Sequence, residues 1–371
     1  MRIAIDARFA NLKVGIGRVA YNLTKEIILL DRENSYVILL GEEDPFSDIK
    51  KDNIKKIKNP SSVKKKLTWQ FIHLPYILKK EKIDIFFSTE NFIIPPFFKG
   101  KTITTVHDLI PLVFKEYLQG RISPYKLKVY MSKLFPPAKF MTVSHFSKEE
   151  IRRVLKVSEK DIFVIKESFD QRLKSIKNES NILHNLEINK PYILGIGGME
   201  MRKNNKVLID AFIDMIEKNT ELKHSLVIVG RIYSKKVPMD TRAIPENLSD
   251  RVKMIIEVSD EELAVLYKNA DIFVYPTIYE GFGLPPLESF KHKTPVITSN
   301  ITSIPEVVKD AAILINPYKK EEIEDAMIKI IRNESLRNEL INKGLSILRN
   351  YDWNKSAKKI INEFRKIYEE K

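Results

Sequence analysis

Residues 272–290 read IFVYPTIYEGFGLPPLESF and contain, in this order, a short apolar run, a glycine-rich loop and the start of a helix. β-Branched and aromatic residues in the first five positions are typical of a buried strand. Gly281 and Gly283 give the loop backbone geometries that are closed to other residues and let main-chain amides approach a ligand. Pro285 or Pro286 suits the first turn of a helix, whose N-terminus favours an anion such as a diphosphate.

The same alternation of apolar runs and helical patterns extends over the whole chain. Strands are expected at 2–7, 36–41, 83–89, 101–107, 140–144, 161–166, 192–197, 225–230, 252–258, 272–276, 295–299 and 312–315. Helices are expected between them, in the first half near 17–31, 65–80, 121–135 and 145–156. Several of the strands are apolar on both faces, as in parallel sheets that helices cover on both sides. The pattern predicts βαβ units and doubly wound α/β sheets.

The alternation stops once, at 168–190, where the sequence is polar and aperiodic. We therefore expect a Rossmann-like N-terminal domain at 1–170, a linker at 171–190 and a Rossmann-like C-terminal domain at 191–353. An apolar stripe at helical spacing marks 354–371, which we expect to cross between the domains and pack back on the first. Ligands of such sheets bind at the carboxyl ends of the strands, so we expect the binding residues in the loops that follow strands.

Charge and composition exclude several classes of protein. The 371 residues contain 63 Lys and Arg, 49 Asp and Glu and no Cys, for a net charge of +14. Without cysteine, disulfides, thiolate metal sites and a cysteine nucleophile are excluded. The first residues, MRIAIDARF, do not resemble a signal peptide, and no apolar run approaches the ~18–20 residues of a membrane span.

The positive charge is concentrated in the first domain, where 1–170 holds 31 Lys and Arg against 20 Asp and Glu. Eight lysines lie between Lys50 and Lys66, here called the lysine segment, which suits anionic lipid headgroups or a nucleic acid. A nucleic-acid binder would interleave aromatic residues, which the segment lacks, so no nucleic acid is expected. Phe97 and Phe98 could insert into a bilayer beside it. The alternative is a solvated, lysine-rich loop.

A second glycine-rich loop follows the first strand of the C-terminal domain. It reads GIGGMEMRKNN at 195–205 and places Arg202 and Lys203 at the start of the next helix. Arginine grips phosphate with a planar fork and lysine binds it as a point charge. Glu280, at the strand end, and Glu288, in the first helical turn, could accept hydrogen bonds from sugar hydroxyls. The alternatives are a surface Arg-Lys pair and a helix-capping glutamate.

Two features of the first domain could also reach a ligand. VGIGRVA at 14–20 fits Gly-x-Gly-x-x-Ala, but it does not directly follow the first strand, so a loop reaching into the cleft is favoured over a dinucleotide site. A dehydrogenase is accordingly disfavoured. His107 ends the strand KTITTVH, where either a ligand contact or a structural role is open.

In order along the chain, these motifs resemble the retaining glycosyltransferases of family 4, which have the GT-B fold. The resemblance is nearest to the bacterial mannosyltransferases of surface polysaccharide synthesis. It rests on GIGR at 15–18, VHDL at 106–109, TVSHFSKEEI at 142–151, RKN at 202–204, YEGFGLPPLES at 279–289, TPVITSN at 294–300 and SIPEVVKDAAILINP at 303–317.

The resemblance implies a role for each site residue. Lys203 and Arg202 would bind the donor diphosphate and Glu288 the ribose. The donor sugar and phosphate would be held by Glu280, Gly281 and the amides of Phe282, Gly283 and Leu284. His107 would touch the transferred sugar, and Gly15, Ile16 and Gly17 would lie at the phosphate and acceptor side. Gly198 stands where many members have Arg, so Arg202 or Arg231 would neutralise the leaving group.

The activity implied is transfer of a hexose, with retention, to a saccharide or lipid-linked acceptor. By resemblance to the mannosyltransferase branch we expect mannose from GDP-mannose, with UDP-glucose or UDP-N-acetylglucosamine as alternatives. No Asp-x-Asp triplet occurs in the sequence, so neither a metal nor another cofactor is expected. We expect a cytoplasmic protein, peripheral on the inner face of the membrane. Two competing functions are a basic nucleic-acid binder and an epimerase or phosphorylase of the same fold.

Overall fold

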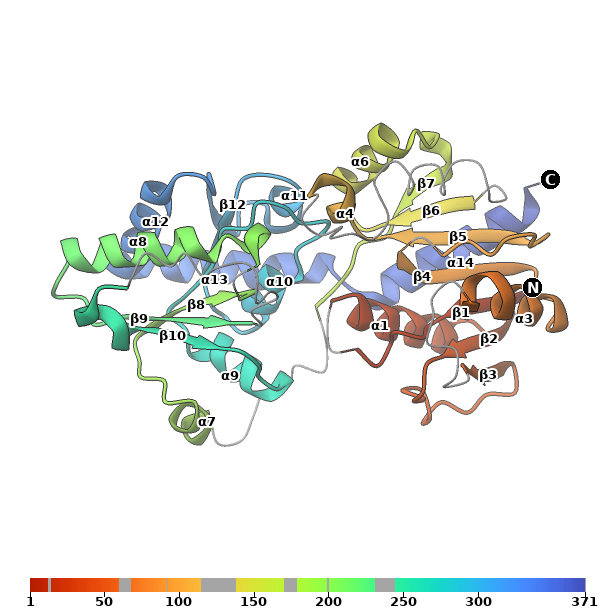
Figure 1. Ribbon diagram of the computed structural model, residues 1–371, viewed down its shortest axis with the longest axis horizontal. Helices are drawn as coiled ribbons and strands as arrows, with labels where there is room; N and C mark the ends of the chain where they lie inside the picture. Colours follow the sequence, from red (N-terminus) through yellow and green to blue (C-terminus); the bar gives the residue numbers. More distant parts are fainter. Residues whose placement is uncertain are drawn as a thin grey trace. The chain divides into compact units, whose positions relative to one another are not determined.

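The computed structural model describes residues 1–12, 15–59, 68–91, 93–114, 138–169, 179–198, 200–230 and 244–370. Contacts divide the chain into unit 1, Met1–Ser168 with Tyr351–Lys371, and unit 2, Phe169–Asn350. Each unit contains one parallel sheet (Figure 1). The helix expected near 121–135 lies outside the described residues. Acceptor binding by the first domain and donor binding by the second stay predictions.

Unit 1 has a seven-stranded sheet of order β3-β2-β1-β4-β5-β6-β7. Its strands are β1 (Arg2–Asp6), β2 (Ser35–Leu40), β3 (Ile54–Lys58), β4 (Ile85–Asn91), β5 (Lys101–Val106), β6 (Ala138–Thr142) and β7 (Ile162–Val164). Strands β2 and β3 are added on one side of β1, and β4 and the later strands are added on its other side. The strand order therefore reverses between β1 and β4, which is the topological switch point of the sheet. This is the doubly wound arrangement that the sequence predicts.

Alternate residues of the strands point to opposite faces of this sheet. Ile3 and Ile5 of β1 face one helical layer, whereas Ala4 belongs to the cluster on the other face. The helices of unit 1 are α1 (Gly15–Leu30), η1 (Trp69–His73), α3 (Leu74–Lys80), α4 (Ile110–Val113), α6 (His145–Leu155), the short η3 (Glu159–Asp161) and α14 (Trp353–Glu369). The apolar character of both strand faces follows from this double cover.

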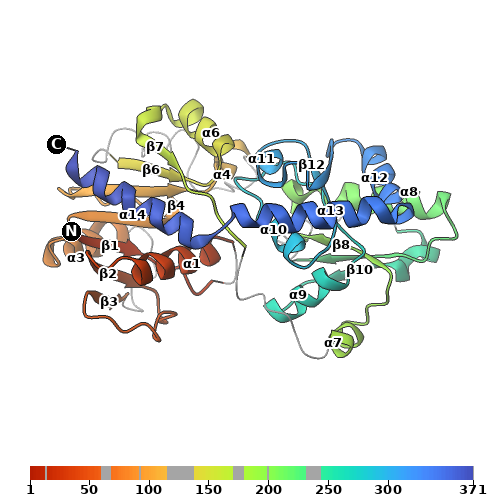
Figure 2. The ribbon, with the colours of Figure 1, turned by 180° about the vertical axis from the view of Figure 1, so that it is seen from behind.

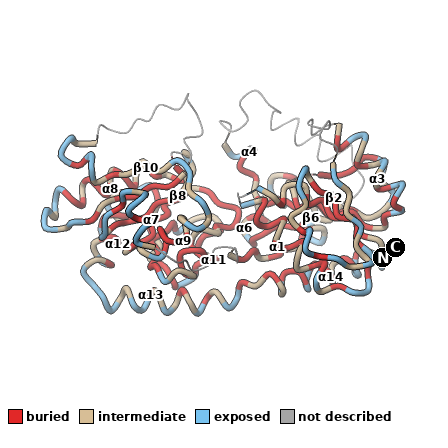
Figure 3. The backbone as a smooth tube through the Cα atoms, turned by 90° about the horizontal axis from the view of Figure 1, so that it is seen from below, coloured by how far each residue is buried: buried red, intermediate tan, exposed pale blue. Residues whose placement is uncertain are grey.

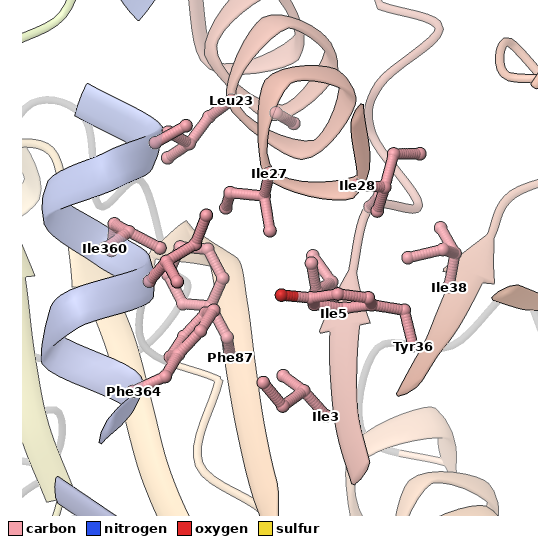
Figure 4. Packing of buried hydrophobic residues seen from close by; sticks show 14 of the residues in the cluster. Ile3, Ile5, Leu23, Ile27, Ile28, Tyr36, Ile38, Phe87, Ile360 and Phe364 are labelled. Atoms are coloured by element: carbon pink, nitrogen blue, oxygen red, sulfur yellow. The ribbon is translucent and has the colours of Figure 1, made fainter. Parts of the chain in front are cut away.

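Helix α14 completes the core of unit 1, although it follows unit 2 in sequence. Its apolar stripe from Trp353 to Ile367 packs beside α1 (Figures 2 and 4). The ring of Phe364 packs edge-on against the ring of Phe87, with the ring centroids 5.7 Å apart. The expected apolar stripe is therefore used within unit 1. In Figure 4, Ile360 and Phe364 of α14 point toward Leu23 and Ile27 of α1 and toward the sheet.

Strand β3 lies inside the lysine segment and was not expected from the sequence. Its residues IKKIK alternate only weakly, and it forms the edge of the sheet beside β2. Lysines on an edge strand oppose pairing with another chain. Three lysines of the segment bind partners within unit 1. Lys51 donates hydrogen bonds to the carbonyl oxygens of Ile28 and Leu29. Lys55 forms an ion pair with Glu81, and Lys56 forms one with Asp44. Lys64, Lys65 and Lys66 lie outside the described residues.

Unit 2 repeats the topology in a six-stranded sheet of order β10-β9-β8-β11-β12-β13. Its strands are β8 (Tyr192–Ile196), β9 (Ser225–Val229), β10 (Val252–Ile255), β11 (Ile272–Tyr275), β12 (Val296–Ser299) and β13 (Ala312–Ile315). All six were expected from the sequence. The switch point falls between β8 and β11, which pair in parallel. Figure 3 shows the strands of both units as mainly buried.

The helices of unit 2 cover both faces of its sheet. They are α7 (Glu179–Asn185), η4 (Met201–Lys203), α8 (Asn205–Lys218), η5 (Glu246–Arg251), α9 (Asp260–Asn269), α10 (Leu284–Lys291), α11 (Ile304–Val308), α12 (Lys320–Arg332), α13 (Glu334–Ile347) and η6 (Leu348–Asn350). Helix α7 lies within the expected linker and packs beside α9, where Glu179 pairs with Lys268 at 2.5 Å. That part of the linker is therefore structured, and 170–178 lies outside the described residues.

No helix in the described part of the chain is long and apolar enough to cross a bilayer.

Candidate active site

The loop after β8 depends on glycine for a close approach. Gly197 and Gly198 have φ of 109° and 57°, in the left-handed region that favours glycine. A Cβ atom on Gly197 would lie 2.3 Å from Cγ of Lys203. The glycine therefore makes room for the lysine stem, which lies across the loop and reaches the buried end of β11.

The loop after β11 is bonded to the loop after β8. The main-chain carbonyl of Arg202 accepts hydrogen bonds from the amide of Ile278 at 2.7 Å and from the hydroxyl of Thr277 at 2.9 Å. Gly283 caps α10 with φ of 101°, as expected, whereas Gly281 does not adopt positive φ. The two loops follow the paired strands β8 and β11 and thus face each other at the switch point of unit 2.

One carboxylate oxygen lies at the centre of the site. Glu280 Oε1 accepts from Arg202 Nη1, Lys203 Nζ and the hydroxyl of Tyr275, each at 2.6 Å. The guanidinium of Arg202 also bonds Glu200, through Nε at 2.7 Å. Here Arg202, Lys203, Glu280, Glu200 and Tyr275 are called the switch-point cluster. Two cations and two carboxylates balance its charge.

Burial and charge oppose each other in this cluster. Burial raises the pKa of Glu280, but Lys203 and Arg202 outweigh it and lower that pKa to about 2. Burial and the neighbouring Arg202 lower the pKa of Lys203 more than Glu280 raises it. Burial lowers the pKa of Arg202 as well, but Glu280 outweighs it and the guanidinium stays charged. The site therefore holds a fixed arginine and a buried lysine beside an ionised carboxylate.

Glu288 lies deeper than the sequence suggested. It is the fifth residue of α10, beyond the first turn in which it was expected, and it is buried. Its Oε2 accepts a hydrogen bond from the hydroxyl of Tyr267 at 3.2 Å. Phe282, Gly283 and Leu284 lie where the loop enters the helix. Their expected roles, and that of Glu288, stay predictions.

The remaining expected donor residues are only partly described. The carbonyl oxygen of Gly198 accepts a hydrogen bond from the side-chain amide of Asn205 at 2.6 Å. Arg231 lies outside the described residues, so its competition with Arg202 for the leaving group stays open. No group of three or more metal-binding side chains occurs among the residues that the structure describes. Metal independence stays a prediction.

In unit 1, both ring nitrogens of His107 have partners. Nε2 lies 2.9 Å from the carbonyl oxygen of Thr89, and Nδ1 lies 3.0 Å from Oε1 of Glu167. A carbonyl only accepts, so Nε2 carries a proton. Burial lowers the pKa of His107, but the Glu167 carboxylate outweighs it and raises that pKa, which favours the imidazolium. A hydrogen bond from this ring to a sugar would have to replace one of the two partners, and the expected sugar contact stays a prediction.

The glycines at 15–17 form the first turn of α1 and not an open loop. A Cβ on Gly17 would lie 2.2 Å from the carbonyl oxygen of Leu12, whereas no atom of the described residues lies within 4 Å of one on Gly15. Ile16 is half-buried between them. Residues 13 and 14 lie outside the described residues.

Several residues that bond the expected ones were missed from the sequence. Tyr275 and Tyr267 bond the two glutamates, and Glu167 bonds the strand-end histidine. Two further missed residues pair with each other at the end of β1, where Arg8 donates to both carboxylate oxygens of buried Asp6, from Nε at 2.8 Å and from Nη2 at 2.9 Å. Their place at or just beyond strand ends is the one signal that could have indicated Tyr275, Asp6 and Glu167.

Two doubly wound sheets in one chain, the second with a buried lysine and a partly buried arginine at its switch point, are typical of the GT-B fold. A model of "Glycosyltransferase Family 4" matches residues 14–171, and one of "Glycosyl transferases group 1" matches 177–346. The chain belongs to this family of glycosyltransferases.

Two mannosyltransferases are similar to this chain in sequence, and one solved structure shares its fold. O-antigen chain mannosyltransferase B of Escherichia coli is 29% identical over 291 residues, which cover 76% of this chain and 74% of the relative. Serotype-specific mannosyltransferase WbdA of Escherichia coli is 28% identical over 282 residues, 72% of this chain but 34% of the relative. Sucrose-phosphate synthase from Thermosynechococcus elongatus has the same fold, with a TM-score of 0.75 at 18% identity and 99% of each chain covered.

Proposed function

We propose that this protein transfers mannose from GDP-mannose, with retention and without a metal, to a saccharide or lipid-linked acceptor in polysaccharide or glycolipid synthesis. The observation that carries the proposal is the switch-point cluster, in which Arg202 and Lys203 lie side by side at the carboxyl edge of unit 2. The choice of mannose is supported by the names of the relatives.

The chemistry requires stabilisation of a departing diphosphate and of positive charge that develops on the sugar. Arg202 and Lys203 supply the first, together with the amides at the N-terminus of α10. Glu280, ionised at neutral pH, lies 2.6 Å from both cations and would stabilise the sugar. In the retaining reaction that we propose, the leaving phosphate accepts the acceptor's proton, so no protein nucleophile is needed.

A panel of donors tests the proposal. Purified protein is incubated with GDP-mannose, UDP-glucose or UDP-N-acetylglucosamine and a lipid-linked saccharide extract, and products are followed by mass spectrometry. We expect mannose on the acceptor, in the donor's anomeric configuration by NMR, with undiminished turnover in a chelator. Turnover with a UDP-sugar but not with GDP-mannose would show that the donor is a UDP-sugar. A product of inverted anomeric configuration, or turnover that a chelator abolishes and manganese restores, would contradict the proposed mechanism.

We also propose peripheral binding to an anionic membrane through unit 1. Phe97 supports this proposal because 93% of it is exposed. Phe98 packs against the core cluster under α3, so the expected pair of inserted rings reduces to one. The lysine segment contributes less than its sequence suggests, because Lys51, Lys55 and Lys56 have partners within the unit.

A further inference from the structure

The switch-point cluster already contains an anion where the donor's phosphates are expected. A single oxygen, Glu280 Oε1, accepts from Arg202, Lys203 and Tyr275. Both cations proposed to bind a diphosphate are therefore engaged by a carboxylate. A phosphate oxygen and a carboxylate oxygen offer the same kind of acceptor to these donors.

Tyr275 differs from the other donors because it is neutral and held in place. Its ring is fully buried and stacks on Phe273 with centroids 5.7 Å apart. Its hydroxyl accepts a hydrogen bond from Lys203, so its one proton points at Glu280. The backbone carbonyl of Tyr275 is fixed by the hydroxyl of Thr298 at 2.8 Å. The hydroxyl therefore has no freedom to follow a ligand.

Binding of a diphosphate would change the partners of Glu280. The two cations would exchange the carboxylate for phosphate oxygens, and an ionised carboxylate left buried without donors is costly. A neutral hydroxyl would not be drawn away by the phosphate charge, so Tyr275 would continue to bond Glu280 after the exchange. The carboxylate then keeps its position and its charge for the sugar.

We propose that Glu280 is an internal substitute for the donor's diphosphate, and that Tyr275 is the positioning residue that holds this carboxylate while Arg202 and Lys203 change partners. The inference rests on the proposed function, because it takes the ligand to be a nucleoside diphosphate. Tyr275 itself does not touch the substrate.

Calorimetric titration tests the role of Tyr275. GDP and guanosine, and in parallel UDP and uridine, are titrated into the wild type and Tyr275→Phe. We expect about tenfold weaker binding of the nucleoside diphosphate and a change below twofold for the nucleoside. Equal loss of affinity for the nucleoside and for the nucleoside diphosphate would indicate a purely structural defect and would overturn the proposal.

Tyr192→Phe is the matched control. Tyr192 on β8 is fully buried too, and its hydroxyl donates to the carbonyl of Leu266 at 2.7 Å, away from the cluster. We expect Tyr192→Phe and Tyr275→Phe to lower the melting temperature by similar amounts. Tyr192→Phe should leave the ratio of nucleoside affinity to nucleoside diphosphate affinity unchanged. A change of that ratio in Tyr192→Phe equal to that in Tyr275→Phe would contradict the specific role of Tyr275.

A second variant, Glu280→Gln, tests the substitution of carboxylate for phosphate and does not depend on the folding of Tyr275→Phe. Removal of the competing charge should tighten nucleoside diphosphate binding several-fold while transfer is lost. Weaker binding in Glu280→Gln would overturn the inference and leave the proposed function standing. Failure of the wild type to bind GDP or UDP would contradict the proposed function, and this inference with it.

Discussion

Glu280 shows how a buried charge is stabilised by its neighbours. The carboxylate lies beside two cations and the hydroxyl of Tyr275, which more than offset the cost of removing it from water. Any change to one donor alters the others, because all of them bond the same oxygen. The residue therefore has a structural role in the free protein that is separate from its proposed role toward the sugar.

This structural role predicts a pH dependence. The folded-state pKa of Glu280, about 2, lies below its ordinary value of 4.5. A lowered carboxyl pKa contributes stability that is fully present above the unfolded value and is lost as pH falls from 4.5 toward 2. The free energy of unfolding of the wild type should thus fall more steeply than that of Glu280→Gln over this range, as measured by urea denaturation. Parallel curves would contradict the ion pairing.

Short elements determine where these side chains lie. The loop after β8 combines positive φ at Gly197 with a lysine stem packed on its Cα. Gly197→Ala would add both backbone strain and a clash with Lys203. We expect it to lower the free energy of unfolding by more than about 1 kcal/mol and to weaken nucleoside diphosphate binding, as calorimetry would show.

A glycine without neighbours provides the control for stability. Gly15 begins α1, and within the described part of the chain no atom lies within 4 Å of an added Cβ. Gly15→Ala should leave the free energy of unfolding within about 1 kcal/mol of the wild type. Equal destabilisation by both substitutions would show that the close approach at Gly197 is not the cause.

The packing of helix α14 on unit 1 can be tested separately. Phe364 is fully buried between α1 and the sheet, so Phe364→Ala should lower the free energy of unfolding by about 3 to 5 kcal/mol. Tyr368 lies on the same helix with 52% of it exposed, and Tyr368→Ala should cost less than about 0.5 kcal/mol. Urea denaturation of both variants is the measurement. Similar losses would contradict the packing of α14 on unit 1.

The sequence predicted elements best where periodicity was strong. Central strands such as β1 and β11 are apolar throughout, because helices cover both faces of their sheets. Strand β3 was missed since its lysines interrupt the apolar pattern at an exposed edge. Helix α7 was missed because a short polar helix that packs on one side resembles a loop in sequence.

For the site, the predicted doubly wound topology accounts for the meeting of Arg202, Lys203 and Glu280, because β8 and β11, the strands that precede them, are neighbours in such a sheet. Tyr275, although it ends a strand, and Tyr267 were not singled out from the sequence. A tyrosine in an apolar strand or helix reads as core, and the partner of its hydroxyl depends on the tertiary fold. The carboxylate that bonds the ring of the strand-end histidine follows a different strand, so it was missed for the same reason.

At the scale of the whole molecule, the net charge of +14 is confined mainly to the first 170 residues. We predict that vesicles with anionic lipid retain the protein at low salt and release it as salt rises. Phe97→Ser should weaken retention several-fold, whereas Tyr318→Ser, which alters a 69% exposed ring in unit 2, should not. Retention that is unchanged by Phe97→Ser would contradict insertion at this site.

In the proposed function, the switch-point cluster binds the diphosphate of a nucleotide sugar. Calorimetric titration of GDP-mannose into the wild type and Lys203→Ala tests it most directly, with Lys218→Ala, which alters a 60% exposed side chain of the same unit, as the control. We predict saturable binding to the wild type and to Lys218→Ala, and affinity lower by about a hundredfold in Lys203→Ala, since a buried cation on the phosphate is lost. Equal affinity in Lys203→Ala, or no binding of GDP- or UDP-sugars by the wild type, would contradict the claim.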